Sequence, residues 1–158
     1  MSETAVTATT TFRERLYVTW WIWPLPLLAA ALLAAEVHMG FPGVRSWLPY
    51  VVLLPLTVFL IIRMGSTTVE VSGGELRVGE AHIPLEMLGE VEVIGPDRRR
   101  AAMGRELDPA AFVMHRGWIK PMVRVRVTDP EDPTPYWIVS TRRPEQLAAA
   151  LKSGVTKG

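Results

Sequence analysis

Two long runs of apolar residues near the N-terminus constrain the fold of this chain more than any other feature. The first run covers residues 16–35 and the second covers 47–62, and neither contains an ionisable side chain other than tyrosine. A helix needs about 20 apolar residues to cross the hydrocarbon core of a bilayer, which is about 30 Å thick. The first run has this length, and the second approaches it when Val44 and Met64 are included or where the bilayer thins. The sequence therefore predicts two membrane-spanning helices that form a hairpin.

A cleaved signal peptide is a competing interpretation of the first run. Arg13 and Arg15 would then form its basic region. However, the run is longer than the usual apolar segment of a signal peptide, and Leu33 is a poor residue three positions before a cleavage after Ala35. A second apolar run also follows directly, so we interpret the first run as a membrane span.

The basic residues that flank the two spans predict their orientation. Arg13 and Arg15 precede the first span and Arg63 follows the second, whereas the connecting loop carries only Arg45, which Glu36 balances. Positively charged flanks stay on the cytoplasmic side of a membrane. We therefore expect a multi-pass protein of the cell (inner) membrane whose N-terminus and C-terminal domain are both cytoplasmic.

Beyond the second span, the apolar residues repeat with a period of two, which is typical of strands with one buried face. Glycines at 73–74 and 79 mark turns between the first of these strands. The clearest alternation of the whole chain lies at 122–127. The predicted strands cover residues 69–71, 76–78, 81–85, 91–93, 112–115, 122–127 and 136–140.

The C-terminal part of the domain predicts a helix over residues 144–152, with Pro144 in its first turn and Gly154 beyond its end. Leu147 and Leu151 are four residues apart and share one face of this helix. About seven antiparallel strands followed by one helix favour a small barrel or sandwich. We expect the two leucines to cover its open end.

This order of elements resembles that of pleckstrin-homology-like domains, and the segment 140–151 is similar to the junction between the last strand and the helix of bacterial versions. The same resemblance covers the opening strands, 67–94. From residue 12 to residue 152 the chain is similar to a family of actinobacterial membrane proteins known only as domain of unknown function three-zero-nine-three. The resemblance implies the architecture and the inner-membrane location, and it implies no activity. The segments that carry it are residues 12–16, 35–44, 47–50, 106–112 and 129–137.

The expected fold is thus a membrane α-hairpin of two transmembrane helices, followed by a small antiparallel, pleckstrin-homology-like β barrel or sandwich with a C-terminal capping helix. The expected parts are a cytoplasmic N-terminal tail (1–15), the hairpin (16–64, with spans at about 16–35 and 45–63), the cytoplasmic β domain (65–153) and a tail (154–158).

The charged residues of the β domain are unevenly distributed along the sequence. Residues 70–92 contain six Glu and one Arg, whereas residues 97–127 contain eight basic and three acidic side chains. One interpretation is a basic face that binds anionic lipid head groups or an acidic partner, with about 1 kcal/mol per basic residue near a membrane. The other is that Glu and Arg pair across neighbouring strands. The candidate basic face comprises Arg98, Arg99, Arg100, Arg116, Lys120, Arg124 and Arg126.

Three smaller sets of residues also invite a functional interpretation, although solvation, surface exposure and core packing explain each of them more simply. Glu36 and His38 are two potential ligands beside the first span, and His82 and His115 are the two histidines of the β domain. Trp118, Tyr136 and Trp137 are aromatic residues suited to a peptide groove. Two ligands are too few for a metal site, and we expect no metal.

The sequence contains no recognised catalytic motif, so we expect the protein not to be an enzyme and to use no cofactor. It has no Cys, which excludes disulfides, a thiolate zinc site and a Cys nucleophile. A net charge of +1 does not favour a nucleic-acid partner. We expect a membrane-anchored adaptor or scaffold that presents the β domain to a partner protein or to anionic lipid. The alternative is a small accessory or regulatory subunit of a transport or cell-envelope complex that acts through its hairpin.

Overall fold

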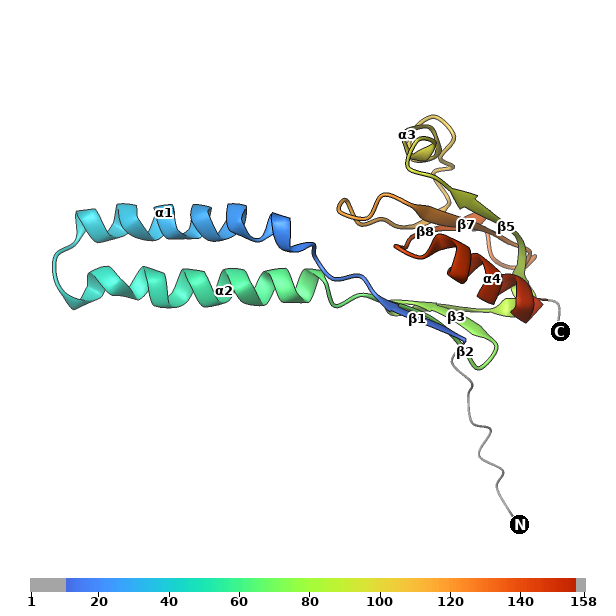
Figure 1. The fold of residues 1–158 in the computed structure, drawn as a ribbon, viewed down its shortest axis with the longest axis horizontal. Helices are drawn as coiled ribbons and strands as arrows, with labels where there is room; N and C mark the ends of the chain where they lie inside the picture. Colours follow the sequence, from blue (N-terminus) through green and yellow to red (C-terminus); the bar gives the residue numbers. More distant parts are fainter. Residues whose placement is uncertain (1–10, 156–158) are drawn as a thin grey trace, which may run out of the picture. The chain divides into compact units, whose positions relative to one another are not determined.

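The chain consists of a β domain and a helical hairpin that is inserted into it (Figure 1). The computed structural model describes residues 11–155. Within this range the β domain combines the residues up to Leu16 with those from Thr68 onward, and residues 17–67 form the second unit. The hairpin therefore separates the first strand of the β domain from the second strand along the sequence.

The hairpin contains two apolar helices, each preceded by a short 3₁₀ turn. Each helix with its turn forms a continuous segment of 21 residues that is long and apolar enough to cross a membrane, judged by length and composition. The predicted first span, 16–35, begins four residues and ends five residues before the first of these segments. The predicted second span, 45–63, differs from the other segment by one residue at each end. The elements are η1 (Trp20–Ile22), α1 (Pro24–Gly40), η2 (Val44–Trp47) and α2 (Leu48–Met64).

Small side chains allow the two helices to lie against each other. Ala30 and Ala34, one turn apart on α1, are buried; small residues at this spacing let helix backbones approach closely. The turn between the helices passes through Gly43, whose φ of +100° disfavours any side chain. Ser46 then donates from its hydroxyl group to the Gly43 carbonyl oxygen at 2.6 Å and closes the turn.

The β domain contains two four-stranded sheets. The first sheet is antiparallel throughout, in the order β1-β2-β3-β4, and the second has the order β5-β7-β8-β6. The strands are β1 (Phe12–Arg15), β2 (Thr68–Ser72), β3 (Glu75–Val78), β4 (Ala81–Pro84), β5 (Leu88–Ile94), β6 (Phe112–Met114), β7 (Met122–Val127) and β8 (Tyr136–Ser140). The helical elements are η3 (Leu85–Met87), α3 (Arg99–Ala102) and α4 (Pro144–Val155).

The first correction to the sequence prediction concerns residues 12–15. They were expected in the N-terminal tail, but they form strand β1, which pairs antiparallel with β2. Phe12, Glu14 and Leu16 are all buried, whereas Arg13 and Arg15 between them are exposed. This alternation of buried and exposed residues is typical of a strand. It was not recognised in the sequence because three of the four strand residues are charged. Residues 1–10 and 156–158 of the predicted tails lie outside the described residues.

The second correction concerns β6, which pairs parallel with β8 although every strand was expected to be antiparallel. Residues 115–121 connect β6 to β7 and carry the chain past β8, which lies between them in the sheet. A connection of this length can cross the end of a neighbouring strand, whereas a tight turn would have forced the two strands to be adjacent.

The main hydrophobic core lies between the inner faces of the two sheets and includes α4. Leu147 and Leu151 are 1% and 0% exposed and belong to this core, which confirms that the C-terminal helix covers it. A smaller cluster lies on the opposite side of the second sheet, where residues from α3 and the loop after it cover the strands. Its buried members are Ile94, Ala102, Met122 and Ile138.

A buried carboxylate links β1 to the junction between β8 and α4. Glu14 is only 7% exposed. Its two oxygens accept a hydrogen bond from the Thr141 hydroxyl group at 2.5 Å and one from the Arg142 backbone amide at 3.0 Å. The Arg143 guanidinium donates to the Arg13 carbonyl oxygen at 2.7 Å. The N-terminal strand and the C-terminal helix are thus joined by polar contacts as well as by the core.

Replacing Leu147 by Ala should lower the free energy of unfolding by about 2–5 kcal/mol, because the side chain is buried and would leave a cavity. Denaturant unfolding of the full-length protein in detergent measures the change. Ala149→Ser, at an exposed position of the same helix, is the matched control. Wild-type stability of the Leu147→Ala variant would show that α4 does not contribute to the core.

Replacing Glu14 by Ala should also destabilise the β domain, because it leaves the Thr141 hydroxyl group and the Arg142 amide without their acceptor. Each unsatisfied buried donor costs about 1–3 kcal/mol. The same unfolding measurement, with Glu90→Ala at an exposed position of β5 as control, tests this expectation. Equal stability of the two variants would contradict a structural role for the buried carboxylate.

Candidate functional site

Two of the seven candidate basic residues are neutralised by glutamates. In the register between β5 and β7, Glu92 lies opposite Arg124, and their side chains approach to 3.3 Å. Arg98 contacts the other oxygen of Glu92 at 2.8 Å. Glu106 lies 3.8 Å from both arginines and completes a group of four charges. The pairing of acidic and basic segments, weighed from the sequence, therefore occurs at this point of the second sheet.

Arg126 lies beside this group, whereas Arg116 has other neighbours. Arg126 lines a shallow cavity of about 260 Å³ that Glu90 and Glu92 also line. The Arg116 guanidinium lies 5.9 Å from the centre of the Trp118 ring, within the range of a cation–π interaction. Its backbone amide donates to the Ser140 hydroxyl oxygen at 3.1 Å.

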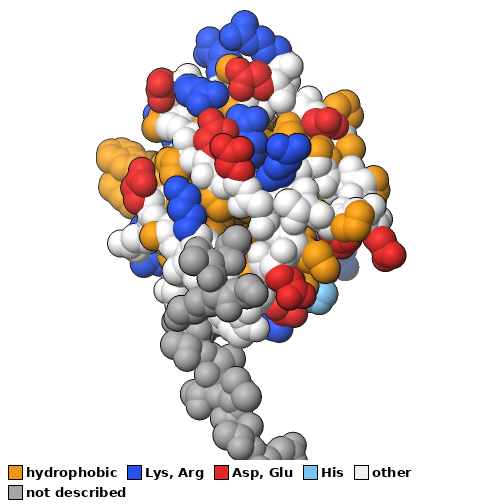
Figure 2. All heavy atoms as spheres, turned by 90° about the vertical axis from the view of Figure 1, so that its right-hand side faces the viewer, with side chains coloured by type: hydrophobic (Ala, Val, Ile, Leu, Met, Phe, Trp, Pro, Cys, Tyr) orange, Lys and Arg blue, Asp and Glu red, His pale blue; other side chains and the backbone are white. Residues whose placement is uncertain are grey.

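The remaining three candidates, Arg99, Arg100 and Lys120, border one cavity of about 670 Å³, which we call the basic pocket. None of the three forms an ion pair with a carboxylate of the described residues. Figure 2 shows Lys and Arg side chains gathered at the top of the domain, at the level where Figure 1 places α3. The pocket is lined by Pro96, Asp97, Arg99, Arg100, Met103, Gly104, His115 and Lys120.

A histidine holds one of these cations in place. The guanidinium of Arg99 lies 2.9 Å from Nε2 of His115. Because a guanidinium group only donates hydrogen bonds, Nε2 must accept and the imidazole must be neutral. Nδ1 then carries the proton and lies 3.5 Å from the Ser140 hydroxyl oxygen. Burial lowers the pKa of His115 below its usual value of 6.5, and the positive charges of Arg99 and Arg116 lower it further.

The two domain histidines considered together in the sequence are on different sheets. His82 is an exposed residue of β4 and lies opposite Arg77 in the neighbouring strand, whereas His115 follows β6 in the second sheet. His38 lies in the last turn of α1, where its ring packs against those of Trp47 and Tyr50, with centroids 5.5 and 6.0 Å away. Within residues 11–155, no three or more His, Asp or Glu side chains come together in a metal-binding arrangement.

The aromatic set considered for a peptide groove is largely occupied by internal contacts. Trp137 is buried in the main core, and its ring centroid lies 4.3 Å from that of Phe112. The Tyr136 hydroxyl group accepts a hydrogen bond from the Asp108 backbone amide at 2.7 Å and donates to the Glu106 carbonyl oxygen at 3.1 Å. Trp118 packs against the core without being fully buried. These contacts serve internal packing.

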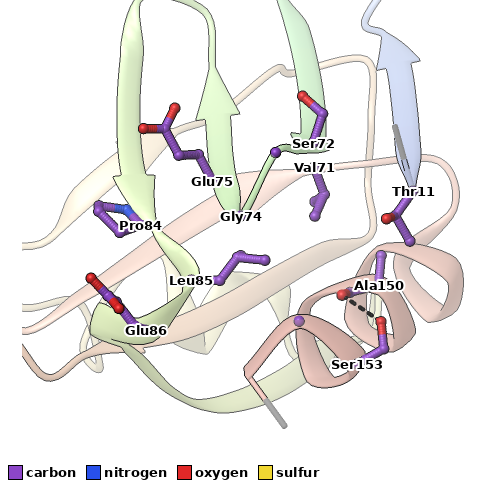
Figure 3. A pocket seen from close by; sticks show the side chains of 12 residues that line it. Thr11, Val71, Ser72, Gly74, Glu75, Pro84, Leu85, Glu86, Ala150 and Ser153 are labelled. Atoms are coloured by element: carbon purple, nitrogen blue, oxygen red, sulfur yellow. Dashed lines mark hydrogen bonds between the residues drawn. The ribbon is translucent and has the colours of Figure 1, made fainter. Parts of the chain in front are cut away.

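A second cavity, of about 550 Å³, lies between the β2–β3 turn, η3 and the end of α4 (Figure 3). Leu85 extends toward α4 in this view and meets Gly154, where an added side chain would clash with it. Glu75 and Glu86 are its two ionisable lining residues, and Glu75 is already paired with Arg77 at 2.9 Å. This cavity therefore has fewer ionisable lining residues than the basic pocket, and none of them is basic.

The sequence did not reveal that His115 and Arg99 form a pair. Sixteen residues separate them, and the intervening segment folds back over the second sheet through the small apolar cluster of Ala102 and its neighbours. Alternating apolar residues identify strands, but they do not predict how an irregular segment packs on a sheet. The buried Glu14 was likewise missed, although its position midway between Phe12 and Leu16 was a usable signal.

Comparison with known proteins assigns the chain to a family without assigning it an activity. The chain belongs to the family described as "Protein of unknown function (DUF3093)", whose model matches residues 11–151. No curated protein and no solved structure matches the chain significantly. The family assignment confirms the resemblance derived from the sequence, and the matched range includes β1, the hairpin, both sheets and most of α4.

The neutral state of His115 can be tested by NMR titration of the histidine side chains. The pKa of His115 should lie below 6.5, and Arg99→Ala should raise it without restoring 6.5, because burial is the largest cause of the shift. At a pH between the pKa of His115 in the folded chain and its pKa of about 6.5 in the unfolded chain, the unfolded chain binds more protons than the folded chain. His115 should therefore make the free energy of unfolding fall as the pH drops below about 6.5. Arg105→Ala, which removes an exposed charge outside the pocket, is the control. A wild-type pKa at or above 6.5 would contradict this arrangement.

Proposed function

We propose that this protein is a non-enzymatic, membrane-anchored adaptor that presents a pleckstrin-homology-like β domain at the inner face of the cell membrane. The β domain would bind a partner protein or anionic lipid through its basic pocket. The observation that carries this proposal is the insertion of two long, apolar helices between two strands that pair in one sheet.

Two features of the helices support membrane insertion. First, most of their large apolar side chains are exposed in the hairpin, including Leu25, Val51 and Ile62. Water would make such a surface unstable, whereas lipid chains would cover it. Second, β1 and β2 pair directly, so the chain before α1 and the chain after α2 must lie on the same side of any membrane that the helices cross. Two crossings satisfy this requirement.

Two features of the β domain support binding rather than catalysis. Strands in two sheets with a C-terminal helix over the core fit the pleckstrin-homology-like arrangement inferred from the sequence. The basic pocket offers fixed cations that attract a negatively charged surface or molecule, and such cations close to an anionic membrane favour association. Short connections join the domain to the hairpin, with three residues between the end of α2 and the start of β2.

The exposed helix surfaces favour one alternative function. A membrane protein that packs against α1 or α2 would also cover these apolar side chains, and the chain would then act as an accessory or regulatory subunit of a transport or cell-envelope complex. In that case the contacts that matter would lie on the hairpin and the basic pocket would be dispensable.

Single cysteines can test the membrane topology directly, because the chain has no Cys. Val44, which begins η2 directly after the turn between the helices, is 91% exposed, and Glu131 in the β domain is exposed as well. A membrane-impermeant maleimide should label Val44→Cys in intact cells, whereas Glu131→Cys should react only after the membrane is opened. Labelling of Glu131→Cys in intact cells would contradict a cytoplasmic β domain.

Crosslinking in native membranes can separate the adaptor from the accessory subunit. Reversing the charges of Arg99, Arg100 and Lys120 to Glu should abolish the crosslinked partner of an adaptor, because an acidic surface would then be repelled. The control is Arg105→Glu, which changes an exposed charge outside the pocket and should leave the partner bound. Retention of the partner by the triple variant, with loss on substitution of exposed α1 or α2 side chains, would favour the accessory subunit.

A further inference from the structure

We propose that the basic pocket binds a tetrahedral dianion of the phosphate class, with Arg99, Arg100 and Lys120 as its ligands. The inference names the ligand chemistry of the surface on which the proposed function depends. A phosphomonoester on a lipid head group and a free phosphate compound share this chemistry, and both would fit a cavity of about 670 Å³.

Charge balance around the pocket is the first argument. Four arginines form ion pairs within the described residues, and each of them contacts a glutamate: Arg13, Arg77, Arg98 and Arg124. Arg98 and Arg99 are adjacent in the sequence, yet only Arg98 is neutralised. Three cations and a single carboxylate, that of Asp97, line the pocket, so two positive charges are left for a ligand. A dianion matches this excess.

The positions of the cations supply the second argument. Arg99 and Arg100 begin α3, whereas Lys120 comes from the loop that precedes β7, so the pocket is built by two segments that are distant in the sequence. His115 lines the same pocket and holds the Arg99 guanidinium through one of its nitrogens. The other guanidinium donors are then oriented in advance, which lowers the entropic cost of binding an anion.

The neutral imidazole supplies the third argument, because it couples anion binding to protonation. The charged groups near His115 are Arg99 and Arg100 from α3, Asp97 before that helix, and Arg116 and Lys120 from the β6–β7 loop; the Ser140 hydroxyl group faces it from β8. Their net charge is positive and opposes an imidazolium ion. A bound dianion would offset this opposition and take over the Arg99 guanidinium as its own partner, which releases Nε2 of His115 to take up a proton. By linkage, the anion should bind more tightly as the pH falls through the pKa of His115.

The test uses the full-length protein in phosphatidylcholine nanodiscs with labelled histidines, whose NMR signals are assigned with a His115→Gln variant. Inorganic phosphate should shift the His115 signal and raise its pKa, and potassium chloride at equal ionic strength should not. Sulfate, which stays a dianion throughout the pH range, should do the same and should bind more tightly at pH 5.5 than at pH 7.5. Arg100→Ala and Lys120→Ala should each weaken phosphate binding about tenfold, whereas Arg105→Ala should not.

Three results would overturn the proposal. They are an unchanged His115 signal on addition of phosphate, the same effect from chloride as from phosphate, and a loss of binding in Arg105→Ala as large as that in Arg100→Ala. The first result would mean that no anion enters the pocket. The second would mean that ions only screen its charges, and the third would mean that binding depends on overall charge and not on the pocket.

A second arm identifies the source of the phosphate group. Nanodiscs that contain phosphatidic acid, a phosphomonoester, should shift the His115 signal without added phosphate and more strongly than phosphatidylglycerol, a phosphodiester with one charge. A response to inorganic phosphate alone would support the pocket and assign a soluble phosphate compound as its ligand. Because the phosphate arm needs no membrane insertion, failure of the pocket and failure of the topology test by cysteine labelling are separate outcomes.

Discussion

The pairing of β1 with β2 is the interaction on which the rest of this structure depends. It joins a short segment before the hairpin to the chain that follows it, in a register that places Phe12 opposite Val71 and Arg15 opposite Thr68. The pairing closes a connection of more than 50 residues, and the hairpin is that connection. Because strands of one sheet share one environment, the two ends of the hairpin must lie on the same side of any membrane that its helices cross.

Polar contacts reinforce this pairing from the other end of the chain. The Glu14 carboxylate accepts hydrogen bonds from Thr141 and Arg142, so β1 contacts the segment that leads into α4. Elsewhere in the described part of the domain, charged side chains lie on the surface, and only some of them form ion pairs. Glu92 and Glu106 neutralise Arg98 and Arg124 on the surface of the second sheet, whereas the cations of the basic pocket form no ion pair with a carboxylate of residues 11–155. This difference, and not the total number of basic residues, separates structural charges from candidates for binding.

Much of the fold could be predicted from the sequence, because strong periodic patterns report local structure. The apolar helices, strands such as Met122–Val127 and the capping leucines Leu147 and Leu151 follow from spacing alone. Strand β1 was missed because it is short and three of its four residues are charged, and the parallel pairing of β6 was missed because periodicity does not determine strand order. The candidate basic residues could be identified from the sequence, but the sequence did not show which of them pair with glutamates. Their partners come from segments that only tertiary packing brings together.

A disulfide between β1 and β2 would test this account most directly. Arg13 and Glu70 are exposed or half-buried partners in the β1–β2 register, and partners across an antiparallel pair lie about 4.5–5.5 Å apart at their Cα atoms, within the range of a disulfide. In the Cys-free chain, the Arg13→Cys/Glu70→Cys double variant should oxidise within one molecule, so that the two halves stay joined after cleavage at a protease site placed in the hairpin loop. Arg13→Cys/Glu90→Cys, with its second cysteine on the other sheet, should not. Separation of the halves of the first variant after oxidation would contradict the insertion of the hairpin into the β domain.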